Sequence, residues 1–178
     1  MLAGPGIDTA LPGLLAELCV EPVDAVSVDV GPGSHTGTRA GMAAALGVAS
    51  ALGVPLHGFV SLEPIAYASL HTGAMRSAPV WAVGPTGRGG LLVARWRAEG
   101  GTARQDGDPS RVDARSWVPP DGEPAFALMA LPDGCAAAGR VDVDLSEETA
   151  IAGLALAALA GMRRPPLETA GLHAGTVA

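Results

Sequence analysis

The chain has 178 residues, 48% of them hydrophobic, and a formal net charge of −7. This length suits one domain or two small lobes, and the acidic balance argues against a broad surface for nucleic acid or anionic membranes. All eleven basic residues are arginines, which excludes a lysine nucleophile, a Schiff base and a Walker-A lysine. Two cysteines without metal or redox spacing, no signal-peptide pattern and no membrane-spanning apolar run predict a soluble, cytoplasmic protein with reduced thiols.

The N-terminal third of the chain is predicted to form a helix, a strand and a second helix. Apolar residues at helical spacing predict a helix over residues 9–19. Apolar and polar residues alternate over residues 24–30, which predicts a strand. The alanine-rich segment 36–52 lacks proline and predicts a long helix that ends at Gly53, because glycine favours the conformation of a helix C-terminus.

The following segment continues this alternation. Residues 55–60 are typical of a short strand, and Ser61 is expected to cap a helix that extends to about Leu70. The resulting order, α-β-α-β-α, is typical of parallel strands joined by crossover helices. We expect residues 1–75 to form a first lobe and residues 76–178 a second, α+β lobe with a flexible C-terminal tail.

The second half of the chain is predicted to contain most of the strands. The glycine-rich turn 85–90 separates two apolar stretches, which predicts a hairpin. Residues 100–124 are polar and rich in Gly, Pro and Asp, so we expect a loop with at most one short helical turn. A helix is predicted over residues 146–162, because its first turn is acidic and Pro165 follows its end. The strands are expected over residues 79–84, 91–98, 125–131 and 141–143.

The glycine-rich run 31–41 joins the first predicted strand to the long helix, where unpaired N–H groups and the helix dipole favour an anion. Phosphate-binding patterns nevertheless fail here: a Walker-A loop needs a lysine, and the third glycine of a dinucleotide fingerprint is displaced by one place. A nucleophile elbow at Ser34 would need glycine where Thr36 stands. We therefore interpret Ser34 or Thr36 as the helix N-cap. The turn before the cap consists of Gly31, Pro32 and Gly33.

Small residues and one cation distinguish the first turns of this helix. Gly37, Gly41 and Ala45 recur every four residues, so one face of the helix is nearly bare and another backbone can approach it closely. Arg39 opposes the helix dipole in the first turn, which indicates a specific partner: Asp29 or an acid across an interface. A solvated arginine is the alternative.

The remaining ionisable residues form no recognisable catalytic or metal-binding set. The four histidines show no metal-ligand spacing. The aspartates of residues 106–121 lie in a turn-rich stretch, where aspartate commonly bonds to its own backbone. We therefore predict no metal site.

The chain resembles the TsaB family in two segments: residues 26–41, VSVDVGPGSHTGTRAG, and residues 49–63, ASALGVPLHGFVSLE. The usual family pattern is GPGSFTGLRIG, then a helix, then LGxPxxGxS(S/T)LE. The resemblance covers about residues 10–70 well and the hairpin at residues 79–98 loosely. It implies an α/β fold of the actin/Hsp70-like (ASKHA) kind, related to the catalytic subunit TsaD.

The resemblance also implies a function. TsaB proteins are non-catalytic partners that pair through helices with TsaD, which transfers threonylcarbamoyl to the adenosine next to the tRNA anticodon. A TsaE-like ATPase is a further implied partner, contact with tRNA is expected to be at most indirect, and neither a cofactor nor a membrane is expected. We expect the interface on the two helices of the first lobe. Its expected residues are Leu14, Leu18, Thr36, Gly37, Arg39, Gly41 and Ala45.

The chain departs from the family pattern at several places. Family members begin with a strand that contains Ile-Asp-Thr, whereas Ile7-Asp8-Thr9 starts a predicted helix here. The first strands of the sheet are therefore expected to be missing, which would leave an exposed sheet edge. Glycine and proline at 84–85 stand where the family has Asp-Ala-Arg. Two alternatives stay open: a glycoprotease-like (M22-type) hydrolase, and a degenerate homodimer without its partner.

Overall fold

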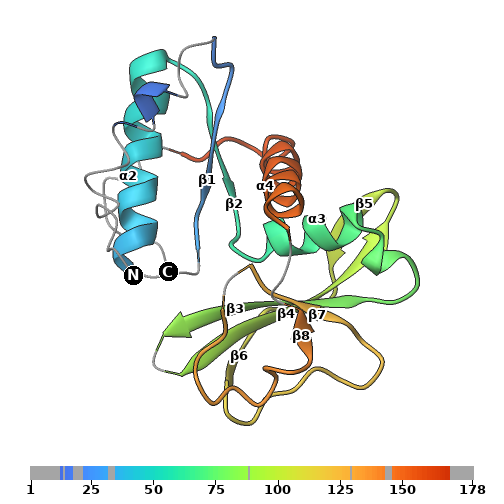
Figure 1. Ribbon diagram of the computed structural model, residues 1–178. Coiled ribbons are helices and arrows are strands. Elements are labelled where there is room, and N and C mark those ends of the chain that lie inside the picture. Colours follow the sequence, from blue (N-terminus) through green and yellow to red (C-terminus); the bar gives the residue numbers. More distant parts are fainter. Residues whose placement is uncertain are drawn as a thin grey trace.

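The computed structural model describes residues 13, 15–17, 22–31, 35–87, 89–128, 130–142 and 146–168. The helices with assigned bounds are α2 (His35–Leu52), α3 (Glu63–His71) and α4 (Glu147–Gly161), with a 3-10 turn η1 (Ala74–Arg76). The strands are β1 (Val26–Asp29), β2 (Leu56–Phe59), β3 (Val80–Gly87), β4 (Gly90–Glu99), β5 (Thr102–Gln105), β6 (Ser110–Asp113), β7 (Ala125–Phe126) and β8 (Val141–Asp142). Figure 1 shows α3 and α4 between the β1–β2 pair and the larger sheet.

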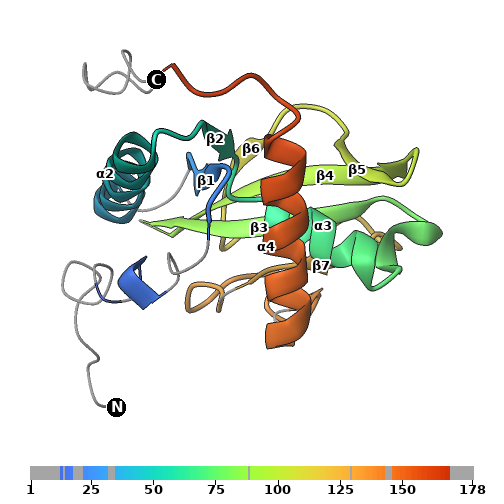
Figure 2. The same cartoon turned by 90° about the horizontal axis from the view of Figure 1, so that it is seen from above.

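The smaller sheet is a parallel pair, β1 and β2, between two helices. α2 covers one face, where Val28, Ala49 and Leu56 are buried, and α4 contacts the other side (Figures 1 and 2). Within the described residues, no strand pairs with the second edge of β1. The predictions of both strands and of the long helix are confirmed, and Gly53 follows α2 with a φ of 67°, as expected of a helix C-terminus.

The larger sheet has the order β5-β4-β3-β7-β8, with β6 also paired to β4. β3 and β4 are antiparallel, which confirms the predicted hairpin, whereas β3, β7 and β8 run parallel. Alternation along β3 divides its side chains between two cores: Val80 and Ala82 pack with α3, and Val83 packs on the opposite face of the sheet.

Two strands lie where the sequence predicts a loop. β5 and β6 both pair with β4 at the same sheet edge, so the prediction of a loop over residues 100–124 is wrong for those eight positions. Their polar residues fit an edge position, because only part of each strand is buried. Gly100 and Gly101 have φ values of 59° and 79°, as a tight hairpin turn requires. The predicted strand at 125–131 is shortened to β7, which pairs with β3 on one side and β8 on the other over two residues each.

α3 and α4 approach each other closely at a glycine. A Cβ atom on Gly153 would lie 2.3 Å from the carbonyl oxygen of Pro64 and 2.8 Å from the Cβ of Ala68. Eight residues further along α4, a Cβ on Gly161 would lie 3.0 Å from the carbonyl oxygen of Gly58 in β2. Glycine at these positions therefore lets α4 contact both α3 and the smaller sheet.

Candidate partner interface

One side of α2 begins with two glycines. Gly37 and Gly41 lie one turn apart on it, and a Cβ atom on Gly41 would meet no atom of the described chain within 4 Å. A Cβ atom on Gly47, on a different side of the helix, would likewise meet no described atom within 4 Å. Helices pack at interaxial distances of roughly 8–10 Å, and small residues favour the lower end of that range. The geometry of α2 therefore suits close contact with another helix.

Ala45 takes a different place from Gly37 and Gly41. It packs with Met42 and Leu46 against the buried cluster of Val28 and Leu56, so it faces the chain's own sheet. The repeat of every four residues drifts around a helix of 3.6 residues per turn, and after two steps it has moved about 80° toward the core. The structure therefore places Ala45 nearer to the core than Gly41, whose Cβ position is free.

Arg39 is exposed on α2 and has no ion-pair partner among the described residues. Asp29, the partner considered from the sequence, is engaged elsewhere: its Oδ1 accepts hydrogen bonds from the Gly31 N–H at 2.7 Å and the Ser61 hydroxyl at 2.8 Å. Asp29 therefore ties together the segments that follow β1 and β2. An acid across an interface and a solvated arginine are the readings that remain for Arg39.

Ser61 does not cap α3, contrary to the sequence prediction. The helix begins at Glu63, its N-cap is Leu62, and no side chain caps it. The hydroxyl of Ser61 instead binds Asp29, which lies 32 positions earlier in the chain. A hydrogen bond to a carboxylate far away in the sequence replaces the expected local capping bond. Sequence spacing does not reveal such a distant partner.

Several expected site residues lie outside the described part of the chain. Gly31 is described, buried and has a φ of 96°, which fits its predicted place in a turn. The N-cap prediction and three of the seven expected interface residues lie outside it. These residues are Leu14, Leu18, Pro32, Gly33, Ser34 and the side chain of Thr36.

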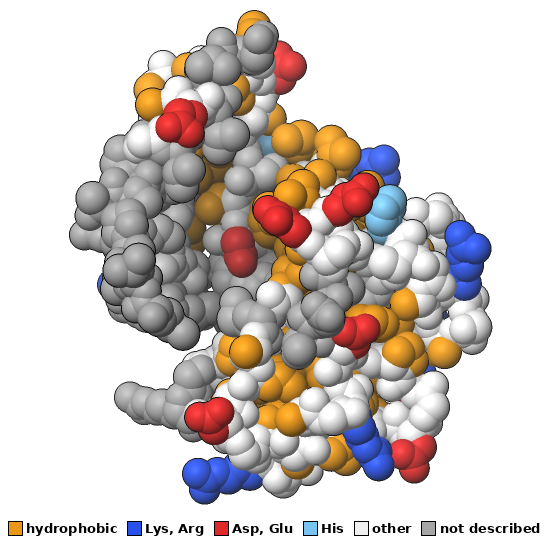
Figure 3. All heavy atoms as spheres, in the orientation of Figure 1, with side chains coloured by type: hydrophobic (Ala, Val, Ile, Leu, Met, Phe, Trp, Pro, Cys, Tyr) orange, Lys and Arg blue, Asp and Glu red, His pale blue; other side chains and the backbone are white. Residues whose placement is uncertain are grey.

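A second exposed apolar surface lies on α4 and was not predicted. Figure 3 shows hydrophobic side chains gathered over the place that α4 occupies in Figure 1. The sequence signal is a helix that is apolar around its whole circumference, which normally indicates contact on more than one side. This surface, the α4 stripe, consists of Ile151, Leu154, Leu159 and Met162, which are 59%, 48%, 56% and 37% exposed.

The start of α3 is joined to the end of α4 by an ion pair. Arg164 donates to both carboxylate oxygens of Glu63, at 2.8 Å and 3.1 Å. Glu63 is 3% exposed, whereas half of the Arg164 side chain is open to solvent. Because a buried carboxylate needs hydrogen-bonded partners, this contact fixes α4 against α3 and has a structural role.

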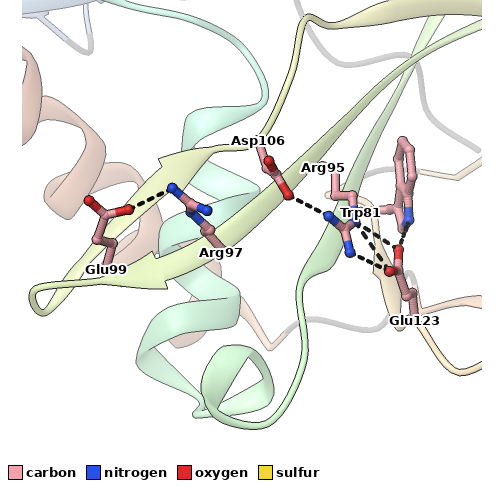
Figure 4. A network of polar contacts seen from close by, with 6 residues as sticks. All are labelled: Trp81, Arg95, Arg97, Glu99, Asp106 and Glu123. Atoms are coloured by element: carbon pink, nitrogen blue, oxygen red, sulfur yellow. Dashed lines mark hydrogen bonds and ion pairs between the residues drawn. The ribbon is translucent and has the colours of Figure 1, made fainter.

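The most connected polar group in the described chain centres on Arg95 of β4 (Figure 4). Its guanidinium binds Asp106 and Glu123, and Glu123 also accepts from the indole N–H of Trp81 at 2.6 Å. The hydrogen bond from Arg95 lowers the pKa of the Glu123 carboxyl; burial opposes that shift, and the bond from Trp81 adds to it. The hydrogen bond with Glu123 in turn raises the pKa of the Arg95 guanidinium. Each charged group of the network is paired, so the network joins strands and presents no free acid or base.

Glu123→Gln should make stability less dependent on pH. Because the folded pKa of Glu123 is lowered, its stabilisation is present above the unfolded pKa of about 4.3 and disappears as pH falls through the folded value. We expect Glu123→Gln to lose about 1 kcal/mol at pH 7, since the network is partly open to solvent, and little at about pH 3. Urea unfolding at both pH values measures this difference. Glu99→Gln, in a more exposed ion pair, is the control and should change less; an equal loss at both pH values would contradict the assignment.

The described residues contain no set of three His, Cys, Asp or Glu side chains placed to hold a metal ion. Cys135 is buried and free. In the same part of the chain, no helix combines the length and apolar character that crossing a bilayer requires.

Comparison with known proteins decides the family. A family model described as TsaD, tRNA N6-adenosine threonylcarbamoyltransferase, matches residues 7–159. The chain belongs to this family. The protein ML0378 of Mycobacterium leprae is 37% identical over 123 residues, which are 66% of this chain and 31% of that protein. The protein Rv3421c of Mycobacterium tuberculosis is 50% identical over 50 residues, which are 28% of this chain and 24% of that protein. The chain thus matches about a third or less of the length of these relatives.

Solved structures show the fold of this TsaD-family chain. YeaZ from Pseudomonas aeruginosa superposes with a TM-score of 0.64 at 21% identity, covering 94% of this chain and 80% of YeaZ. A protein with similarity to the peptidase YeaZ, from the same organism, gives a TM-score of 0.63 at 22% identity, with 91% and 78% covered. The actin/Hsp70-like (ASKHA) fold expected from the sequence is thereby confirmed. The expectation of missing first strands stays a prediction, since residues 1–12 lie outside the described part.

Proposed function

We infer that this TsaD-family chain acts as a non-catalytic, TsaB-like partner of a TsaD-like catalytic subunit. The complex would transfer threonylcarbamoyl to the adenosine next to the tRNA anticodon. The family match and the YeaZ-like fold support a place in this modification. The glycines of α2 carry the proposal, because the free space at Gly41 would let a helical partner approach closely there.

The charge of α2 fits the same contact. Arg39 lies exposed in its first turn and Asp29 is already hydrogen-bonded, so the guanidinium is available to an acid on the partner. An arginine at the edge of an apolar contact contributes mainly orientation and rate of association. The proposed interface therefore has a closely packed centre and one charged residue at its rim.

Light scattering on a size-exclusion column tests the proposal directly. The chain is mixed with the TsaD-like protein of the same organism, and the mass of the complex is measured. We expect a heterodimer, and reconstitution with it should raise threonylcarbamoyladenosine in tRNA, measured by mass spectrometry of nucleosides. Separate elution of two folded proteins would contradict the proposal.

Self-association is a second candidate, and the α4 stripe favours it. Glu147 and Glu148 precede the stripe and Arg163 follows it, so two antiparallel α4 helices would place opposite charges together while covering their apolar sides. The mass of the chain alone decides: Leu154→Glu should convert a dimer to a monomer, because it places a charge in the centre of the contact. A monomer at all concentrations excludes this candidate.

A further inference from the structure

A polar pocket lies where the β3–β4 hairpin meets the end of β6. Its volume is about 580 Å³, and it is open to solvent. The pocket lies on the larger sheet, whereas the proposed docking surface lies on α2 beside the smaller sheet. It is lined by Gly89, Gly90, Arg111, Val112, Asp113 and Arg115.

Strand pairing brings these residues together from two parts of the chain. Gly90 pairs with Asp113 and Leu92 with Arg111, so the arginine lies on the same face of the sheet as Gly90. The N–H of Ala114 donates to the carbonyl of Gly89 at 3.0 Å, which joins the end of the hairpin to the turn that carries Arg115. The backbone around the pocket is therefore fixed by hydrogen bonds.

Thr86 and Arg111 pack closely onto Gly90. A Cβ atom there would lie 2.8 Å from the hydroxyl oxygen of Thr86 and 3.2 Å from Nε of Arg111. The Thr86 hydroxyl is buried and does not line the pocket. The absence of a side chain at position 90 therefore lets the Arg111 guanidinium lie against the sheet at the edge of the pocket.

The charges of the pocket favour an anion. Arg111 and Arg115 are exposed, and neither guanidinium has a partner among the described residues, whereas Arg95 of the same sheet binds two carboxylates. The nearby Asp113 is engaged by its own turn, since its Oδ1 accepts from the N–H of Arg115 at 2.8 Å. Two guanidinium forks supply several donors, which suits an oxyanion with oxygens in several directions.

We propose that this pocket binds a phosphate group, held by the guanidinium groups of Arg111 and Arg115. Gly90 is required because a Cβ atom at this position would lie 3.2 Å from Nε of Arg111 and would displace its guanidinium. The phosphate is that of a nucleotide or of an RNA backbone, since both present the same oxygens. The site goes beyond the proposed docking function and does not depend on it, because none of its residues belongs to α2.

Titration of the ¹⁵N-labelled chain with inorganic phosphate at constant ionic strength tests the site. The amide signals of Gly89 and Gly90 should shift and saturate. Arg111→Ala should weaken binding at least about tenfold, because it removes a charge-assisted contact. Arg76→Ala is the matched control, because this arginine is exposed and lies outside the pocket. Arg111 is exposed, so its variant should remain folded, which circular dichroism checks.

Adenosine monophosphate and a short single-stranded RNA distinguish the sources of the phosphate. Tighter binding of the nucleotide assigns the site to a nucleotide, and tighter binding of the RNA assigns it to a backbone phosphate; in both cases Arg111→Ala must reduce affinity. Amide shifts that do not saturate would overturn the proposal. So would an affinity that Arg76→Ala reduces as much as Arg111→Ala does.

Discussion

Gly41→Leu should weaken binding of the TsaD-like subunit at least about tenfold, because an isobutyl group would separate two closely packed helices. Overpacking a close contact typically costs about 1–3 kcal/mol, and each 1.4 kcal/mol is a factor of ten in affinity. The chain itself should keep its stability, because a Cβ at Gly41 meets no described atom within 4 Å and leucine is the better helix former. Isothermal titration calorimetry with the TsaD-like protein measures the dissociation constant.

Gly47→Leu is the matched control for this experiment. It makes the same change in the same helix, also with free space around the Cβ, but about 120° away around the helix axis. We expect it to bind the partner as the wild type does. If Gly47→Leu weakens the complex and Gly41→Leu does not, the partner contacts a different side of α2.

Gly153→Ala should destabilise the chain by about 2 kcal/mol, although alanine is the better helix former. The added methyl group would lie 2.3 Å from a backbone carbonyl oxygen of α3, which cannot rotate away as a side chain could. Overpacking of this kind costs about 1–3 kcal/mol, occasionally more, and exceeds the roughly 1 kcal/mol that alanine gains in a helix. Thermal and urea unfolding measure the change.

Gly47→Ala provides the opposite expectation in the same assay. Its Cβ has free space, so the helix propensity should appear as a gain of about 0.5–1 kcal/mol. The two glycine-to-alanine changes would thus shift the free energy of unfolding in opposite directions. A gain at Gly153 would show that the α3–α4 contact is looser than the structure describes, and a loss at Gly47 would show that the space around its Cβ is not free.

Local signals sufficed for the elements that have long, unambiguous patterns. α2 and its end at Gly53, the two strands of the smaller sheet, the β3–β4 hairpin and α4 all follow from periodicity and glycine positions. β5 and β6 could not be predicted from local signals. They are short, polar edge strands that form by pairing with β4 and show little hydrophobic pattern of their own.

The candidate interface was only partly predictable, for a geometric reason. The spacing of Gly37 and Gly41 identifies a bare helix side, but the spacing does not say which side faces the core, and Ala45 turned out to face it. The engagement of Asp29 by Ser61, and the exposure of the α4 stripe, depend on segments that lie far apart in the chain. Sequence spacing does not encode such contacts.

By itself, the sequence determined the absence of lysine chemistry, the resemblance to TsaB and most of the regular elements, because composition and local periodicity are properties of neighbouring residues. Only the tertiary structure decided where α4 packs, which sides of α2 and α4 stay open, and that Arg111 and Arg115 gather at one pocket. Those outcomes depend on which surfaces of distant segments meet and exclude water, and that is settled by packing of the whole chain.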